Sequence, residues 1–205
     1  MSFYARHVLP RIVNASLSAH VFDASRKRVC AGLSGNVIEI GFGSGLNVPF
    51  YPPSVSHVAA IEPSDLAWRL AADRVAASRV PIERAGLDGQ TLPFPDATFD
   101  AALSTYTLCT IPDVGAALAE VRRVLHPGGV LHFLEHGRAP DERLRRWQHR
   151  LEPLQRLVYG GCHLTRPIDD LVTAAGFTIV ALDRYYEADV PQLSGSMYLG
   201  AARSA

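Results

Sequence analysis

The chain has 205 residues, of which 48% are hydrophobic and 20% are charged. This size and composition fit one folded α/β domain with a large core and leave too little chain for two ordinary domains. Twenty basic and twenty acidic residues give a net charge of zero, which removes the general electrostatic argument for nucleic acid or an acidic membrane as a partner.

The cysteines Cys30, Cys109 and Cys162 are scattered and show no C-x-x-C spacing. An odd, scattered set is typical of a reducing compartment rather than of a disulfide framework, so we expect a cytoplasmic protein. The sequence shows no apolar stretch of membrane-spanning length and no signal-peptide core. Lys27 is the only lysine, and this preference for arginine favours a GC-rich bacterial genome.

Residues 1–35 are predicted to form a helical cap segment ahead of a core that spans 36–205, the two together making a single domain. We favour helices that simply pack on the edge of a sheet. A second interpretation stays open, in which the segment is a lid that brings Phe3, Tyr4 and His7 near a substrate.

A short apolar strand runs directly into a glycine-rich turn at residues 36–45. The turn carries an E-x-G-x-G-x-G pattern formed by Glu39, Gly41, Gly43 and Gly45. Glycines at this spacing let the backbone turn sharply and let a ligand lie against the main chain. A dinucleotide fingerprint would place its third glycine where this chain has Leu46, so the spacing disfavours a nicotinamide cofactor.

Strands and helices are predicted to alternate along the rest of the chain. Three prolines after the glycine turn must keep the first of these helices short. The predicted strands are 57–61, 82–84, 100–105, 130–136, 178–183 and 197–201, and the predicted helices begin after the cap residue Ser64 and cover 113–125 and 141–155. This alternation favours a doubly wound, mostly parallel sheet with helices on both faces.

The helix predicted over 141–155 has an apolar stripe and an arginine-rich remainder. The stripe consists of Leu144, Trp147, Leu151 and Leu154. We interpret the arginines as a solvated helix face rather than as a patch that binds nucleic acid.

Two acidic residues stand where a bound nucleotide would need them. Glu62 ends the predicted strand 57–61 and lies about 20 residues beyond the glycine turn, the place of a carboxylate that accepts ribose hydroxyls. Asp88 opens the stretch D-G-Q-T-L-P-F-P-D-A-T-F-D at residues 88–100. This stretch and the glycine turn resemble the corresponding motifs of class I S-adenosylmethionine (SAM) methyltransferases.

The resemblance implies a Rossmann-like α/β fold, a seven-stranded and mostly parallel sheet with an antiparallel last strand, and SAM as the cofactor. It also implies that Glu62 takes the ribose hydroxyls and Asp88 the adenine amino group, while Thr105 faces the sulfonium. Leu92 would line the adenine pocket. The full set of implied cofactor-binding residues is Glu39, Gly41, Gly43, Gly45, Asn47, Glu62, Pro63, Asp88, Gly89, Leu92 and Thr105.

Three further stretches of sequence indicate which group of methyltransferases the chain resembles. They are residues 41–52, residues 104–111, and F-L-E-H at 133–136 followed by G-G-C-H-L-T-R at 160–166. Together they resemble the thiol S-methyltransferase group, which implies methyl transfer from SAM to a small-molecule acceptor, with a thiol as first choice. Two alternatives stay open: an O- or C-methyltransferase of a phenol or quinone, and a non-catalytic SAM-binding protein.

His136 is the first candidate for a catalytic base or orienting group, because it ends a predicted strand at the carboxyl edge of the sheet. His163 and Tyr106 are further candidates. The hypothesis predicts that His136→Ala lowers turnover sharply while SAM affinity survives.

Several cysteines and histidines also raise the question of a metal, namely Cys109, Cys162, His132, His136 and His163. Their spacing matches no standard zinc pattern, so we predict no metal site. Cys162 is expected to be a small buried residue rather than a nucleophile, because methyl transfer from SAM needs no covalent enzyme intermediate.

Overall fold

A single seven-stranded sheet with the order β3-β2-β1-β4-β5-β7-β6 forms the centre of the computed structural model, which describes residues 3–204. Residues 1, 2 and 205 of the predicted domain lie outside the described residues. The strands are β1 (Gly35–Ile40), β2 (Val55–Ile61), β3 (Ile82–Gly86), β4 (Phe99–Thr105), β5 (Leu125–His136), β6 (Phe177–Tyr186) and β7 (Ser196–Ser204). Strands β1 to β5 pair in parallel, whereas β7 is antiparallel to both β5 and β6. The predicted fold class is confirmed.

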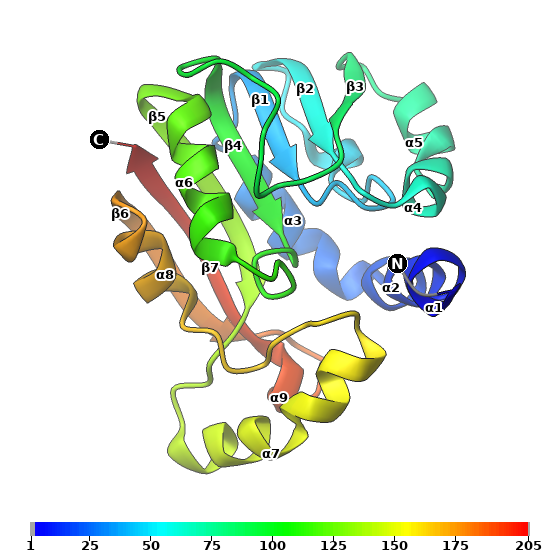
Figure 1. The fold of residues 1–205 in the computed structure, drawn as a ribbon, viewed down its shortest axis with the longest axis vertical. Helices are drawn as coiled ribbons and strands as arrows, with labels where there is room; N and C mark the ends of the chain where they lie inside the picture. Colours follow the sequence, from blue (N-terminus) through cyan, green and yellow to red (C-terminus); the bar gives the residue numbers. More distant parts are fainter. Residues whose placement is uncertain (1–2, 205) are drawn as a thin grey trace.

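Helices cover both faces of this sheet (Figure 1). They are α1 (Phe3–His7), α2 (Leu9–Leu17), α3 (Asp23–Cys30), α4 (Asp65–Leu70), α5 (Ala72–Ala76), α6 (Val114–Val124), α7 (Glu142–Val158), α8 (Ile168–Ala174) and α9 (Gln192–Gly195), with 3-10 turns η1 (His20–Phe22) and η2 (Val48–Phe50). As the prolines predicted, only the short η2 follows the glycine turn. Ser64 caps α4 by accepting a hydrogen bond from the Ala67 N–H at 3.2 Å.

The core has two parts because successive strand residues point to opposite faces of the sheet. Val37 and Leu103 pack with the α3 residues Val29 and Cys30 on one face. On the other face the neighbouring residue Ile38 lies in a cluster that takes in α6 and α8. Both faces of the central strands are therefore dry, and polar side chains are left at the strand ends.

Several predicted boundaries differ from the structure, among them the ends of β6 and β7, which lie at Tyr186 and Ser204 rather than at 183 and 201. The strand predicted at 130–136 begins already at Leu125, because Leu125 pairs with Phe99 before the ladder shifts register. The helix predicted at 141–155 continues through Pro153 to Val158. It begins as expected after Asp141, which accepts a hydrogen bond from the Leu144 N–H at 2.9 Å.

The apolar stripe of α7 is only partly covered, since the side chains of Trp147 and Leu154 are 53% and 58% exposed. The buried contact of α7 is polar instead. Gln148 accepts a hydrogen bond from the Ala139 N–H and donates to the carbonyl oxygens of Gly137 and Leu193. An amide side chain suits this position because it can pair with a backbone donor and with backbone acceptors at the same time.

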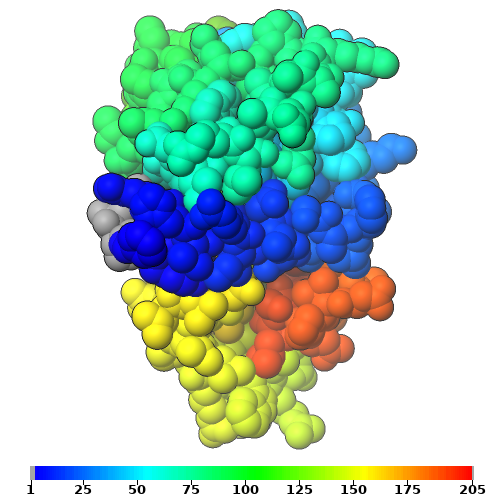
Figure 2. Space-filling view, turned by 90° about the vertical axis from the view of Figure 1, so that its right-hand side faces the viewer, coloured from blue at the N-terminus to red at the C-terminus, as the bar shows by residue number. Residues whose placement is uncertain are grey.

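The N-terminal helices α1 and α2 lie across one side of the molecule. Figure 2 shows them as a dark blue band between the teal segments around α4 and α5 and the yellow segment of α7. The Tyr4 hydroxyl donates to the Val158 carbonyl at 2.6 Å, which ties α1 to the end of α7. Among the described residues, no helix combines the length and apolarity that crossing a membrane requires.

Candidate active site

A cleft of about 690 Å³, the strand-end cleft, opens beyond the carboxyl ends of β1, β2 and β4. This is the edge at which doubly wound sheets bind their ligands. Eight of the predicted cofactor-binding residues line it: Gly41, Gly43, Asn47, Glu62, Pro63, Asp88, Gly89 and Thr105.

The glycine turn forms the floor of the strand-end cleft. Gly41, Gly43 and Gly45 have φ angles of +70°, +60° and +73°, which other residues rarely adopt. A Cβ at Gly41 would lie 2.1 Å from the Thr107 hydroxyl oxygen. Gly45 faces the Phe42 ring rather than the cleft, so its expected contact with the cofactor stays a prediction.

Glu62 holds the turn from the tip of β2. Its two carboxylate oxygens accept hydrogen bonds from the Gly43 N–H at 2.6 Å and the Ser64 N–H at 2.7 Å. Burial raises the pKa of this carboxyl, and the two main-chain donors partly counteract that effect. The carboxylate thus lines the cleft at the position where ribose recognition is predicted.

A buried polar network lies behind the turn. Glu39 accepts hydrogen bonds from the Asn47 amide at 2.8 Å and from the Tyr51 hydroxyl. Asn47 also donates to the Thr105 hydroxyl at 2.9 Å and accepts from the Arg26 guanidinium at 2.7 Å. Burial raises the pKa of Glu39 to about 7. Glu39 therefore orients Asn47 rather than lining the cleft itself.

Arg26 lines the strand-end cleft, and the sequence analysis missed it. It comes from α3, and its side chain is only 3% exposed. Its position in the sequence could have indicated its burial. Arg26 lies three residues before Val29 and therefore shares the side of the helix that packs against the sheet. An arginine at a buried helical position is rare unless it is paired.

The two residues predicted to contact adenine, Asp88 and Leu92, lie in different places in the structure. Asp88 lies at the cleft with an exposed side chain, and its carboxylate accepts from the Gln90 N–H at 2.8 Å. Leu92 is buried with Ile61 and Phe99 in the main core and does not line the cleft. Its contact with adenine stays a prediction.

A second cavity of about 430 Å³, the side cavity, adjoins the strand-end cleft. The two share the lining residues Val13, Leu17, Tyr106, Thr110 and Tyr159. His136 lines the side cavity, whereas His163 does not, and the catalytic role of each stays a prediction. His163 is instead paired through Nδ1 with the Glu152 carboxylate at 2.9 Å.

Tyr106 stands at the junction of the two cavities, directly after β4. Its backbone is left-handed, with φ of +53°. The Arg26 guanidinium lies 5.3 Å from the centre of its ring. The Tyr106 hydroxyl is buried and has no hydrogen-bond partner among the described residues, and burial raises its pKa. The phenol therefore stays protonated and has a free donor at the junction.

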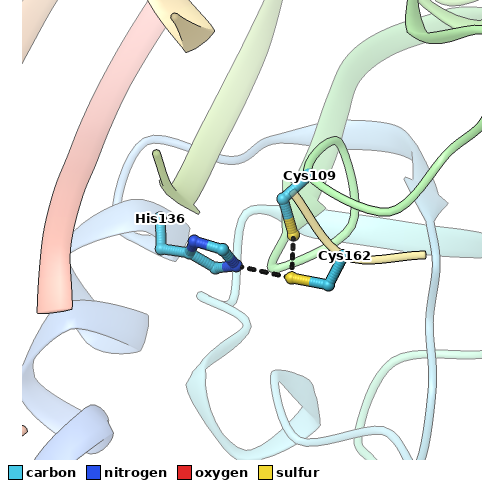
Figure 3. A group of neighbouring side chains, drawn as sticks. All are labelled: Cys109, His136 and Cys162. Carbon is cyan, nitrogen blue, oxygen red and sulfur yellow. Dashed lines mark hydrogen bonds between the residues drawn. The ribbon is translucent and has the colours of Figure 1, made fainter. Parts of the chain in front are cut away.

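Three of the residues that the sequence analysis set aside as metal ligands come together in the side cavity (Figure 3). The His136 Nε2 lies 2.8 Å from the Cys162 Sγ, which lies 3.7 Å from the Cys109 Sγ. Sequence spacing did not indicate this, because the residues come from β5 and from the loops after β4 and α7. The third cysteine, Cys30, is the last residue of α3 and is buried among apolar residues.

The thiol of Cys162 is poorly suited to act as a nucleophile by itself. Its hydrogen bond to Cys109 and its burial raise its pKa far above the usual range. For His136, burial lowers the pKa, but the hydrogen bond to Cys162 and the charge of Glu135 outweigh it, so that the net shift is upward.

Comparisons with known proteins agree with this geometry. Residues 38–133 match a family described as a methyltransferase domain. The thiol S-methyltransferase TMT1B of Rattus norvegicus is 32% identical over 151 residues, which cover 72% of this chain and 62% of that protein. In sequence and fold the chain is similar to the class I SAM-dependent methyltransferases. The matches support SAM as its cofactor, and the strand-end cleft, where we predict that SAM binds, is called the SAM cleft.

Other relatives of this chain bear different names. The ubiquinone/menaquinone biosynthesis C-methyltransferase UbiE of Caulobacter vibrioides is 46% identical over 57 residues, which are 28% of this chain and 23% of that protein. A solved SAM-dependent methyltransferase of Thermotoga maritima, titled a possible histamine N-methyltransferase, has a TM-score of 0.70 at 23% identity over 97% of this chain and 99% of that one. The chain is thus similar to proteins named for several acceptors. It spans less than two thirds of the length of the thiol S-methyltransferase it matches.

Proposed function

We propose that the chain transfers the methyl group of SAM to the thiol of a small molecule held in the side cavity. The observation that carries this proposal is the side cavity itself, whose wall meets the SAM cleft at Tyr106, one residue beyond the predicted sulfonium contact Thr105. Its volume of about 430 Å³ is that of a small-ligand pocket. The name of the rat relative supports a thiol as the acceptor.

Methyl transfer requires an in-line approach of the acceptor sulfur to the methyl carbon, opposite to the bond that breaks. A cavity that adjoins the SAM cleft supplies that alignment by holding donor and acceptor in neighbouring sites. The apolar side chains around the side cavity, among them Val13, Val21 and Phe22, exclude water from the path. Because thiolate and sulfonium neutralise each other as they react, a dry cavity does not oppose the reaction.

The acceptor must react as a thiolate. A free thiol has a pKa of about 8.5, so only a small fraction is ionised at neutral pH. His136 is the predicted base or orienting group that lines the cavity, and the buried hydroxyl of Tyr106, another lining residue, has no partner among the described residues. We expect His136→Ala to reduce thiol methylation strongly while the affinity for SAM stays unchanged.

A second candidate is methylation of carbon or oxygen on a phenol or quinone. It is favoured by the short segment that is 46% identical to UbiE. An apolar cavity accepts an aromatic ring as readily as an alkyl thiol, so the wall residues do not discriminate between them. A protein that binds SAM and methylates no acceptor is the remaining alternative.

One experiment separates these functions. The purified protein is incubated with SAM and, in separate reactions, with alkyl thiols, aryl thiols, phenols and quinols. S-adenosylhomocysteine and the methylated products are measured by mass spectrometry. A methyl thioether supports the proposal, whereas a methylated ring carbon or oxygen without any thioether overturns it. SAM binding without a product from any acceptor would support a non-catalytic role.

A further inference from the structure

The donor atoms of Cys109, His136 and Cys162 lie within 4.8 Å of one another. Figure 3 shows the three side chains pointing toward one another from separate segments of the chain. All three are buried, and all three line the side cavity. We propose that they bind a zinc ion whose fourth coordination position is open to the acceptor thiol.

The sulfur atoms already have the spacing that zinc needs. Two thiolates at about 2.3 Å from a tetrahedral zinc ion lie about 3.8 Å apart. The Sγ atoms of Cys109 and Cys162 are 3.7 Å apart. An imidazole nitrogen and a sulfur on the same ion lie about 3.5 Å apart, so the His136 Nε2, now 2.8 Å from the Cys162 Sγ, has to withdraw by less than about 1 Å.

The surroundings favour a metal over three separate polar groups. The His136 Nδ1 is buried without a partner among the described residues, so the imidazole makes its one polar contact through Nε2, toward the sulfurs. A single polar contact offsets little of the cost of burying an imidazole. Two thiolates and one Zn²⁺ sum to zero charge, which an apolar cavity accepts far more readily than isolated ions.

Three protein ligands and one open position are the arrangement of catalytic rather than structural zinc sites. The open position faces the side cavity, where the proposed acceptor lies. A thiol that coordinates zinc loses its proton, which passes to solvent, and remains as a zinc-bound thiolate. A lone pair of that sulfur then forms the new bond to the methyl carbon. The carbon–sulfonium bond breaks, and its electron pair stays on the sulfur of S-adenosylhomocysteine.

This inference rests on the proposed thiol methylation, and it changes the role of His136 from base to ligand. The same site also accounts for product release, because the methyl thioether is neutral and is a weaker zinc ligand than the thiolate. Product would therefore leave as the next thiol binds. No oxidant or reductant takes part in the step.

Zinc binding is measured directly on the full chain. The protein is purified under reducing conditions, stripped with a chelator, and titrated with Zn²⁺ against a chromophoric competitor. We expect one bound zinc ion per chain. Each of Cys109→Ser, Cys162→Ser and His136→Ala should weaken the binding by more than the about 100-fold that loss of an outer-shell partner costs. Cys30→Ser is the matched control, because it removes a buried cysteine remote from the site and should leave zinc affinity unchanged.

Cobalt substitution gives a second measurement that needs no variant. Co²⁺ bound by the wild-type chain should show a thiolate-to-cobalt charge-transfer band, and this band should change when an alkyl thiol is added without SAM. A band that is present but insensitive to thiols would contradict the open position.

The outcomes separate the two proposals. Thiol methylation at full rate by a metal-free, reduced protein overturns the role of zinc in the reaction and leaves the proposed function intact. Zinc binding that requires all three residues, without a thioether from any thiol, supports the site and overturns the function. A wild-type chain that binds no zinc after full reduction, or that forms a Cys109–Cys162 disulfide in its place, overturns the inference as well.

Discussion

Replacing Glu39 by glutamine should remove a pH dependence of stability that the wild-type chain possesses. Burial raises the pKa of Glu39 from 4.5 to about 7. Between these values the folded state holds a proton that the unfolded state has released, so the stability falls as the pH rises through this window. At about 1.4 kcal/mol per pKa unit, the loss is about 2 to 3 kcal/mol between about pH 5 and about pH 8.

Glutamine fits the site because the Asn47 amide and the Tyr51 hydroxyl approach different oxygens of Glu39. The oxygen of the introduced amide side chain would accept from Asn47, and its nitrogen would donate to the hydroxyl oxygen of Tyr51.

Urea unfolding of the ligand-free protein at the two pH values gives the free energies of unfolding for wild type and Glu39→Gln. The wild type should lose about 2 to 3 kcal/mol more than the variant between them. Glu83→Gln, a change of a mostly exposed carboxyl on β3, is the control. An equal pH dependence in wild type and Glu39→Gln would refute the reasoning, because it would mean that burial does not penalise the charge of this carboxyl.

Three further substitutions test other parts of the site. Glu62→Ala removes the acceptor of two main-chain N–H groups and should weaken SAM binding about 100-fold by calorimetry; unchanged affinity would contradict that role. Tyr106→Phe deletes an unpartnered buried hydroxyl, so it should stabilise the ligand-free chain by about 1 kcal/mol and slow methylation while SAM affinity is kept. Loss of stability instead would mean that the hydroxyl has a partner. Gln148→Ala leaves three backbone groups without their partner and should cost about 3 kcal/mol in urea unfolding, whereas the exposed Trp147→Ala should change little.

Features that lie on one contiguous stretch of sequence could be predicted from that stretch alone. The strand and the glycine turn before Leu46 are contiguous, so one stretch of sequence specifies both the central strand and the floor of the SAM cleft. Glu62 was predictable for the same reason, since it directly follows β2. The prolines after the turn likewise limited the helix to η2.

What the sequence did not reveal depends on contacts between distant segments. Arg26 reaches Asn47 from another helix, and a helical pattern contains no information about such a partner. Cys109 and Cys162 are separated by 53 positions, yet their sulfurs lie 3.7 Å apart. Metal-site motifs rely on fixed spacings between ligands, so spacing cannot identify a cluster assembled from one strand end and two separate loops.

The apolar stripe of α7 is a related case, because its burial depends on other segments of the chain. Trp147 and Leu154 satisfy the helical period, but the period states only that they share a face and not that another element covers it. The polar Gln148 between them is the buried residue, because the backbone around it requires hydrogen-bond partners.

The helix α2 contributes Val13 and Leu17 to the walls of both cavities. A molecule that contacts this helix from one side therefore biases the position that the helix presents to the other side. The affinities for the two ligands are then thermodynamically linked, and the linkage is reciprocal: whatever factor the donor adds to the affinity for the acceptor, the acceptor must add to the affinity for the donor. The order in which donor and acceptor bind, and the effect of each on the affinity for the other, would thus depend on a helix that contributes no chemical group to the reaction.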